Sequence, residues 1–102
     1  MSATVFEKQG SQLTVKPEGR LDTASSPVLE SEMQPYLDGV QDVIMDFTKV
    51  EYISSGGLRL MLTTDQQLEN RGGSLKIIHV NENILEIFNL VGFTDIITVE
   101  QD

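Results

Sequence analysis

The sequence predicts a small α/β domain built on a mostly parallel sheet. An alternating hairpin pattern opens the chain, and short apolar runs then alternate with segments whose apolar residues recur every three or four positions. The expected order is β-β-α-β-α-β-α-β. Strands that alternate with helices favour parallel pairing through right-handed crossovers. The 102 residues fit one domain, 1–102.

Residues 4–19 are predicted to form an N-terminal β-hairpin. The apolar residues of its two arms are Val5, Phe6, Leu13 and Val15. Gly10 and Ser11 supply a two-residue turn, and glycine in the first place suits a type II′ geometry. Pro17 has no N–H to give to a ladder, so the second strand should become irregular near that point.

The first helix is expected in residues 22–39, DTASSPVLESEMQPYLDG. Its candidate caps are Thr23, Ser25 and Ser26, and its apolar residues at helical spacing are Val28, Leu29, Met33 and Leu37. Pro27 suits a first turn. Pro35 disfavours a regular final turn, and Gly39 follows as a stop.

The next strand is expected in DVIMDF, residues 42–47, whose nearly continuous apolar character is typical of a parallel strand covered on its faces. Residues 48–57, TKVEYISSGG, are expected to be a loop. A second helix should run from about Gly57 to Asn70 and end at RGG. Its apolar stripe is Leu58, Met61, Leu62 and Leu68.

The last three elements follow the same alternation. SLKIIHV, residues 74–80, reads as a strand, and a third helix should begin at Asn81 or Asn83 and stop at Gly92. Its expected stripe is Ile84, Ile87, Phe88 and Val91. DIITVE, residues 95–100, is predicted to be the final strand.

Composition excludes several classes of function. The formal charge is −9, which repels phosphate backbones and disfavours direct nucleic-acid binding. No run approaches the roughly 20 apolar residues that span a bilayer, and the N-terminus lacks a signal-peptide pattern. With no cysteine the chain has no disulfide or thiolate metal site, and the cytoplasm is the expected compartment. Acidic residues lack metal-loop spacing, so neither a metal nor a cofactor is expected.

The stretch VEYISSGGLRLML, residues 50–62, is the candidate functional segment. Ser55 lies at or just before the predicted second helix, and the next amides belong to Gly56 and Gly57. The first N–H groups of a helix lack intrahelical partners, and the helix dipole adds partial positive charge. A hydroxyl at this place can cap the helix, and a phosphate attached to it would also be tolerated. Both interpretations remain open on the residues alone.

VIMDFTKVEYISSGGLRLML, residues 43–62, resembles the signature region of the STAS domain of bacterial anti-sigma factor antagonists. The family has an apolar strand, then Asp, an apolar residue and Ser or Thr, and later Asp-Ser-Ser/Thr-Gly-Leu opening a helix. The matching residues are Asp46, Phe47, Thr48, Ser55, Gly57 and Leu58. GRLDT, residues 19–23, resembles the family's Gly-x-Leu/Ile-Asp element. The resemblance covers essentially the whole chain in element order.

The resemblance implies a STAS fold and a phosphorylation-controlled switch that is not an enzyme. In the family, a partner kinase that is also the anti-sigma factor phosphorylates the serine that falls on Ser55, and a PP2C-type phosphatase reverses this. The unphosphorylated domain binds the anti-sigma factor and frees the sigma factor. Ser54 replaces the usual Asp and is a second candidate acceptor, and Gly56 replaces the usual Ser or Thr.

The expected partner surface comprises Asp22, Ser54, Gly56, Gly57 and Arg59, with the two glycines leaving the helix start open to the kinase. Asp22 could instead cap the first helix, and Arg59 could be a solvated charge or contact a phosphate or the partner. His79 is expected to be packed on a core strand. The free domain should be a monomer. The G-x-S-x-G nucleophile motif and the P-loop lysine are both missing.

Two other functions remain possible from the sequence. One is a STAS scaffold or adaptor that does not switch, which Ser54 in place of Asp favours. The other is a small nucleotide- or anion-binding module that uses the start of the second helix.

Overall fold

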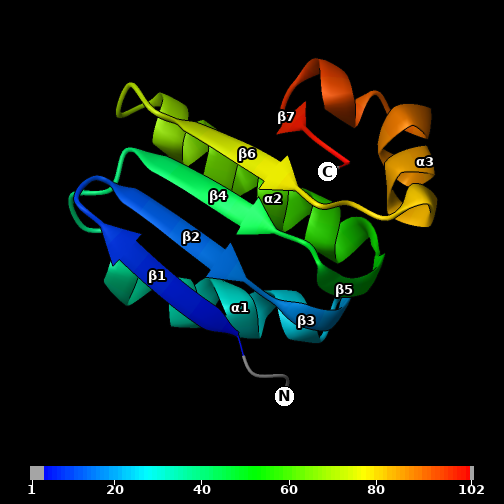
Figure 1. The fold of residues 1–102 in the computed structure, drawn as a ribbon, viewed down its shortest axis with the longest axis horizontal. Coiled ribbons are helices and arrows are strands. Elements are labelled where there is room, and N and C mark those ends of the chain that lie inside the picture. The colour runs from blue at the N-terminus through cyan, green and yellow to red at the C-terminus, as the bar shows by residue number, and fades with distance from the viewer. Residues whose placement is uncertain (1–3, 102) are drawn as a thin grey trace.

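The computed structural model describes residues 4–101, whose elements follow the predicted alternation of strands and helices (Figure 1). In chain order these are β1 (Val5–Gln9), β2 (Gln12–Lys16), β3 (Glu18–Leu21), α1 (Ser25–Met33), η1 (Gln34–Tyr36), β4 (Asp42–Asp46), β5 (Lys49–Ile53), α2 (Ser55–Glu69), β6 (Ser74–Ile78), α3 (Glu82–Leu90), η2 (Phe93–Asp95) and β7 (Thr98–Val99).

The main sheet has the order β1-β2-β4-β6-β7, with β1 antiparallel to β2 and the other neighbours parallel. The predicted fold class, including the N-terminal hairpin, is therefore confirmed. Gly10 has φ 61° and Ser11 is outside the left-handed region, as a type II′ turn requires. Pro17 separates β2 from β3.

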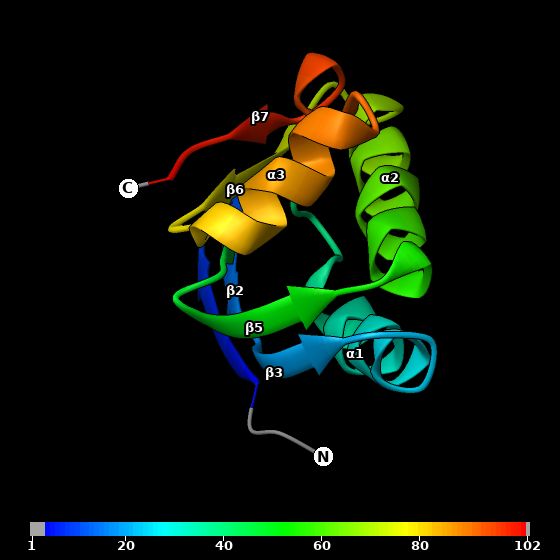
Figure 2. The ribbon, with the colours of Figure 1, turned by 90° about the vertical axis from the view of Figure 1, so that its right-hand side faces the viewer.

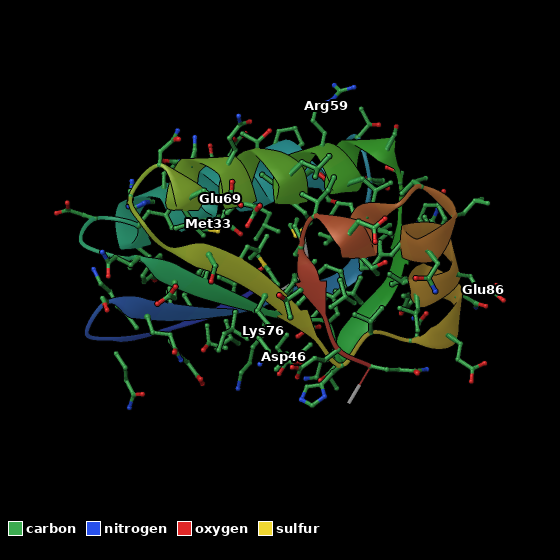
Figure 3. All side chains as sticks on the ribbon, turned by 90° about the horizontal axis from the view of Figure 1, so that it is seen from above. Met33, Asp46, Arg59, Glu69, Lys76 and Glu86 are labelled. Atoms are coloured by element: carbon green, nitrogen blue, oxygen red, sulfur yellow. The ribbon has the colours of Figure 1, made fainter. Side chains whose placement is uncertain are left out.

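Helices α1 and α2 cover one face of the main sheet, and no helix of the described residues lies over the centre of the other face (Figures 1 and 3). The expectation that the β4 segment is covered on both faces is wrong. Val43 and Met45 are buried, whereas Ile44 between them is only half-buried. Ile44 is paired with Thr14 and Lys76 on the uncovered face.

This asymmetry gives a stability prediction for β4. Met45→Ala should cost about 2–5 kcal/mol because it leaves a cavity in the core, whereas Ile44→Ala should cost about 0.5–1.5 kcal/mol. Met45 has 0% of its surface exposed. Urea titration of the two variants checks the difference. Equal costs would mean that both faces of the strand are equally enclosed.

Residues 48–57 are not the predicted loop, because Lys49–Ile53 form β5. This strand pairs in parallel with β3 as a separate two-stranded sheet (Figure 2). The pairing register shifts between Gly19 and Arg20. Val50 and Ile53, three positions apart, are both buried, so the strand lacks the strict alternation by which strands are recognised.

The helices lie where they are predicted, but the residues that they bury differ in part from the predicted ones. Val28, Leu62 and Val91 were expected inside and are exposed, and Leu60 is buried without having been expected. Asn81 caps α3, as expected, by accepting a hydrogen bond from the Ile84 amide at 2.8 Å.

The predicted final strand 95–100 is mostly wrong. Gly92 has φ 74° and the chain turns there into η2, so that only Thr98–Val99 pair with β6. Ile97 is buried by this turn. The apolar run therefore reflects burial in an irregular segment and not a regular strand.

Candidate functional site

The ends of β3 and β5 bring the starts of α1 and α2 together at one end of the molecule (Figure 2). The Ser54 amide donates a hydrogen bond to the Leu21 carbonyl at 2.9 Å, which extends the β3–β5 pairing to the point where α2 begins. Parallel strands end at the same edge, so the segments that follow them must lie side by side. This arrangement places Asp22 and Ser55, distant in sequence, at one site.

The two adjacent serines have different environments. Ser54 is the N-cap of α2, with φ −106° and ψ −176°, and its carbonyl accepts a hydrogen bond from the Leu58 amide at 2.9 Å. Its hydroxyl is buried and has no hydrogen-bond partner within residues 4–101. Ser55 is the first residue of α2 and is exposed. Ser55 is therefore the more accessible of the two serines.

The two glycines after Ser55 allow α2 to approach β3 and β5 closely. A Cβ atom on Gly57 would lie 2.6 Å from Ile53 Cγ1 and 2.7 Å from the Leu21 carbonyl oxygen. A Cβ atom on Gly56 would lie 3.0 Å from Thr23 Cα. Gly57 is buried, so its contribution is to packing, while Gly56 is half-buried at the edge of the site.

Asp22 organises the turn into α1. Its Oδ1 accepts hydrogen bonds from the Ala24 and Ser25 amides at 3.1 and 2.9 Å. Its own amide donates to Ser25 Oγ, and Arg20 Nε lies 3.9 Å from its Oδ2. The hydrogen bond from the Ser25 amide is the main reason that the pKa of Asp22 lies below its ordinary value. The side chain of Asp22 thus caps the turn that leads into α1, whose N-cap residue is Ala24, and a contact of Asp22 with a partner stays a prediction.

This geometry predicts an acid-sensitive contribution to stability. Because the folded-state pKa of Asp22 is lowered, its stabilisation is present above the unfolded-state pKa of about 3.9 and is lost as the pH falls through the folded-state value. Asp22→Ala should therefore be less stable than the parent chain at neutral pH, with a difference that shrinks in acid. Thermal unfolding from pH 7 to about 3 measures this. A constant difference would contradict it.

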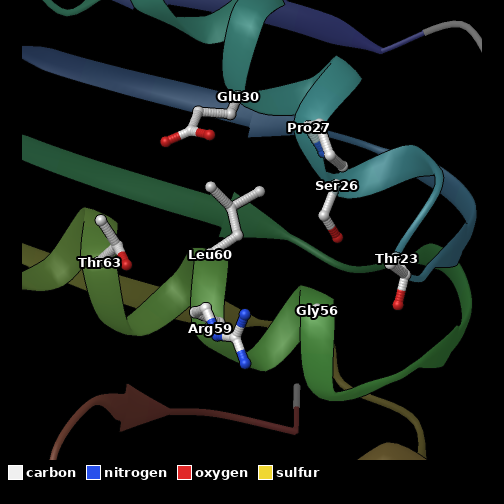
Figure 4. A pocket seen from close by; sticks show the side chains of 8 residues that line it. All are labelled: Thr23, Ser26, Pro27, Glu30, Gly56, Arg59, Leu60 and Thr63. Atoms are coloured by element: carbon white, nitrogen blue, oxygen red, sulfur yellow. The ribbon is translucent and has the colours of Figure 1, made fainter.

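A cavity of about 210 Å³ lies between the first turns of α1 and α2 (Figure 4). It is lined by Thr23, Ser26, Pro27, Glu30, Gly56, Arg59, Leu60 and Thr63. Arg59 is exposed, and its guanidinium points from its backbone toward the Gly56 end of α2 (Figure 4). Within residues 4–101 no carboxylate forms an ion pair with it.

Arg20 and Tyr52 form a feature that the sequence analysis missed. The Arg20 guanidinium lies 4.4 Å from the centre of the Tyr52 ring, in a cation–π arrangement on the β3–β5 sheet. The two residues are cross-strand partners. Because the β5 segment has the pattern of a loop, no feature of the sequence predicts that these two residues are in contact.

Asp46 and Thr48, although part of the family-like motif, lie at the end of β4 and not at the Ser55 site. Partial burial acts to raise the pKa of Asp46, but hydrogen bonds from the Thr48 hydroxyl and amide outweigh it and leave the pKa lowered. His79 is exposed, with φ 59°, so the prediction of a packed core histidine is wrong. It follows the last residue of β6, where the chain turns away from the sheet.

Within the described residues, 4–101, no group of three or more acidic, cysteine or histidine side chains is placed to hold a metal ion. None of the helices in this part of the chain combines the length and the apolar character that crossing a membrane requires.

Comparison with known proteins places these features in a family. The STAS domain model matches residues 3–102. The anti-sigma-B factor antagonist of Bacillus subtilis is 30% identical over 100 residues, which cover 97% of this chain and 92% of the relative. That of Staphylococcus aureus is 32% identical over 88 residues, covering 85% of this chain and 82% of the relative.

The solved structure of unphosphorylated SpoIIAA, an anti-sigma factor antagonist, has the same fold. Its TM-score is 0.76 at 16% identity, with 98% of this chain and 88% of that chain covered. Both the family model and the sequence relatives span nearly all of the fold described above. The chain therefore belongs to the STAS domain family, as a relative of the anti-sigma factor antagonists.

Proposed function

We propose that this chain is an anti-sigma factor antagonist controlled by phosphorylation of Ser55. It binds an anti-sigma factor that is also a serine kinase, and this binding releases a sigma factor for transcription. A PP2C-type phosphatase restores the active form. The chain acts as a cytoplasmic binding module, monomeric when free, with no catalytic step of its own.

The observation that supports this proposal is the difference between the two serines. A kinase must bring the γ-phosphoryl group of ATP in line with the attacking hydroxyl, which needs an accessible oxygen. Ser55 is exposed, whereas the Ser54 hydroxyl is buried. At the first position of α2 the product phosphate also lies near amides that have no intrahelical partner.

The proposed chemistry is the transfer of a phosphoryl group from ATP to Ser55 and its later removal by hydrolysis. Ser55 Oγ loses its proton to a base of the kinase and forms a bond to the γ-phosphorus of ATP, while the bond from that phosphorus to ADP breaks. The phosphatase removes the group by hydrolysis: water attacks the phosphorus, the bond from phosphorus to Ser55 Oγ breaks, Oγ takes up a proton, and inorganic phosphate leaves. The proposed role of this chain is to present Ser55 at the start of a helix.

The proposed partner surface is formed by the exposed groups around Ser55. Asp22 and Arg59 supply charge near the serine, and the half-buried Gly56 supplies backbone at the edge of the site. The buried Gly57 and the Ser54 hydroxyl would act indirectly, by fixing the position of the helix start.

The test is incubation of the chain with ATP and with each anti-sigma-type serine kinase encoded in the source genome. Intact mass should rise by one phosphate, and fragmentation should locate it on Ser55. The Ser54→Ala variant, which keeps Ser55, is the matched control and should be phosphorylated normally. Phosphate on Ser54 would contradict the site. Stable kinase binding without phosphorylation would instead support a scaffold that does not switch.

A further inference from the structure

The position of Arg59 points to a role beyond its place in the proposed partner surface. It lies four residues after Ser55 on α2, and residues at this spacing are neighbours on one face of a helix. Helical side chains lean toward the N-terminus, and the Arg59 guanidinium points toward the Gly56 end of α2 (Figure 4). It forms no ion pair within the described residues.

We propose that Arg59 is the intramolecular partner that binds a phosphate on Ser55. The planar guanidinium can donate two parallel hydrogen bonds to two phosphate oxygens, a geometry that lysine does not offer. This inference rests on the proposed function, since it concerns the phosphorylated form of Ser55. It adds a residue that recognises the modification within the same chain.

The charges around the site make Arg59 the available cation. Asp22 lies in the turn before α1, and Glu30 of α1 lines the cavity beside Gly56, so both carboxylates repel a phosphate brought near them. The Arg20 guanidinium lies 4.4 Å from the centre of the Tyr52 ring, and its Nε lies 3.9 Å from Asp22 Oδ2, so Arg20 is already engaged. Among the residues that line the cavity, Arg59 is the only one with a positive charge.

The pairing changes the surface in two ways at once. A phosphoserine carries about −1.5 to −2 charges, so one guanidinium leaves part of the negative charge exposed. Pairing with the phosphate also makes Arg59 unavailable to an acidic side chain of the partner. The modification therefore reverses the sign of the charge beside Ser55 without requiring a movement of α2.

The experiment uses the 102-residue chain with phosphoserine inserted at position 55 during translation, so that no kinase is needed. Phosphorus NMR then measures the second pKa of the phosphate in the parent chain and in Arg59→Gln. We expect the pKa with Arg59 present to be lower by about 0.2–0.4 unit, as for an ion pair four residues apart on a helix. Arg59→Lys should recover only part of this difference.

Arg20→Gln is the matched control, because it changes the net charge by the same amount at the same end of the molecule. Its effect on the phosphate pKa should be clearly smaller. An unchanged phosphate pKa in Arg59→Gln would overturn the proposal. Equal shifts in Arg59→Gln and Arg20→Gln would also overturn it, because they would reflect only the change in net charge and not a direct pair. Kinase treatment of the unmodified chain is a separate measurement. A failure of the phosphorylation proposal is thus distinguishable from a failure of this one.

Discussion

Ser55→Asp should lose binding to the anti-sigma kinase while Ser55→Ala keeps it. The carboxylate places a permanent negative charge at the centre of the proposed interface and occupies Arg59, and burying this charge against the kinase costs about 2–5 kcal/mol. That corresponds to a dissociation constant weakened roughly 30-fold or more. Isothermal titration of the purified kinase with each variant measures the difference.

Both variants should keep the parent fold, because Ser55 is exposed at the first helical position and is not one of the buried core residues. Amide NMR spectra provide the control. Shift changes confined to the start of α2 fit a change of surface charge. Changes spread across the main sheet would indicate a conformational switch, and equal binding by both variants would leave Ser55 with only a structural role.

Gly57→Val should destabilise the chain more than any change at the neighbouring Gly56. Even the first atom of the new side chain would lie 2.6 Å from Ile53 Cγ1 and 2.7 Å from the Leu21 carbonyl oxygen. The backbone oxygen cannot rotate away, so α2 must move off β3. Overpacking of this kind costs about 1–3 kcal/mol or more.

Gly57→Ala and Gly56→Ala form the matched pair for this test, because both add one methyl group in the first turn of α2. Each gains up to about 1 kcal/mol of helix propensity. At Gly56 the methyl group would meet Thr23 Cα at 3.0 Å, so the backbone before α1 must shift by a few tenths of an ångström, less than the contacts at Gly57 require. Urea unfolding should therefore show a larger loss at Gly57. Equal stabilities would mean that α2 is loosely held against β3.

Regular periodicity made most of the fold predictable from the sequence. The hairpin and the three helices follow apolar repeats of two or of three to four residues, and β4 and β6 lie in short apolar runs. Errors arose where burial does not follow a period. In β5 the pairing with β3 skips Glu51, so Val50 and Ile53 are both buried at a spacing of three.

The candidate site could be predicted only in part. Ser55 and Asp22 were identified from local motifs, and the hydrogen bonds of Asp22 are local too. The burial of the Ser54 hydroxyl could not be predicted, because it depends on how β5 pairs with β3. The cation–π pair of Arg20 and Tyr52 depends on the same pairing.

The uncovered face of the main sheet makes the chain convenient to label. The sequence has no cysteine, so Gln12→Cys would introduce a single thiol. Gln12 is exposed at the start of β2, at the opposite end of the sheet from β3 (Figure 1). A fluorophore attached there would report complex formation through slower tumbling while standing clear of the serine.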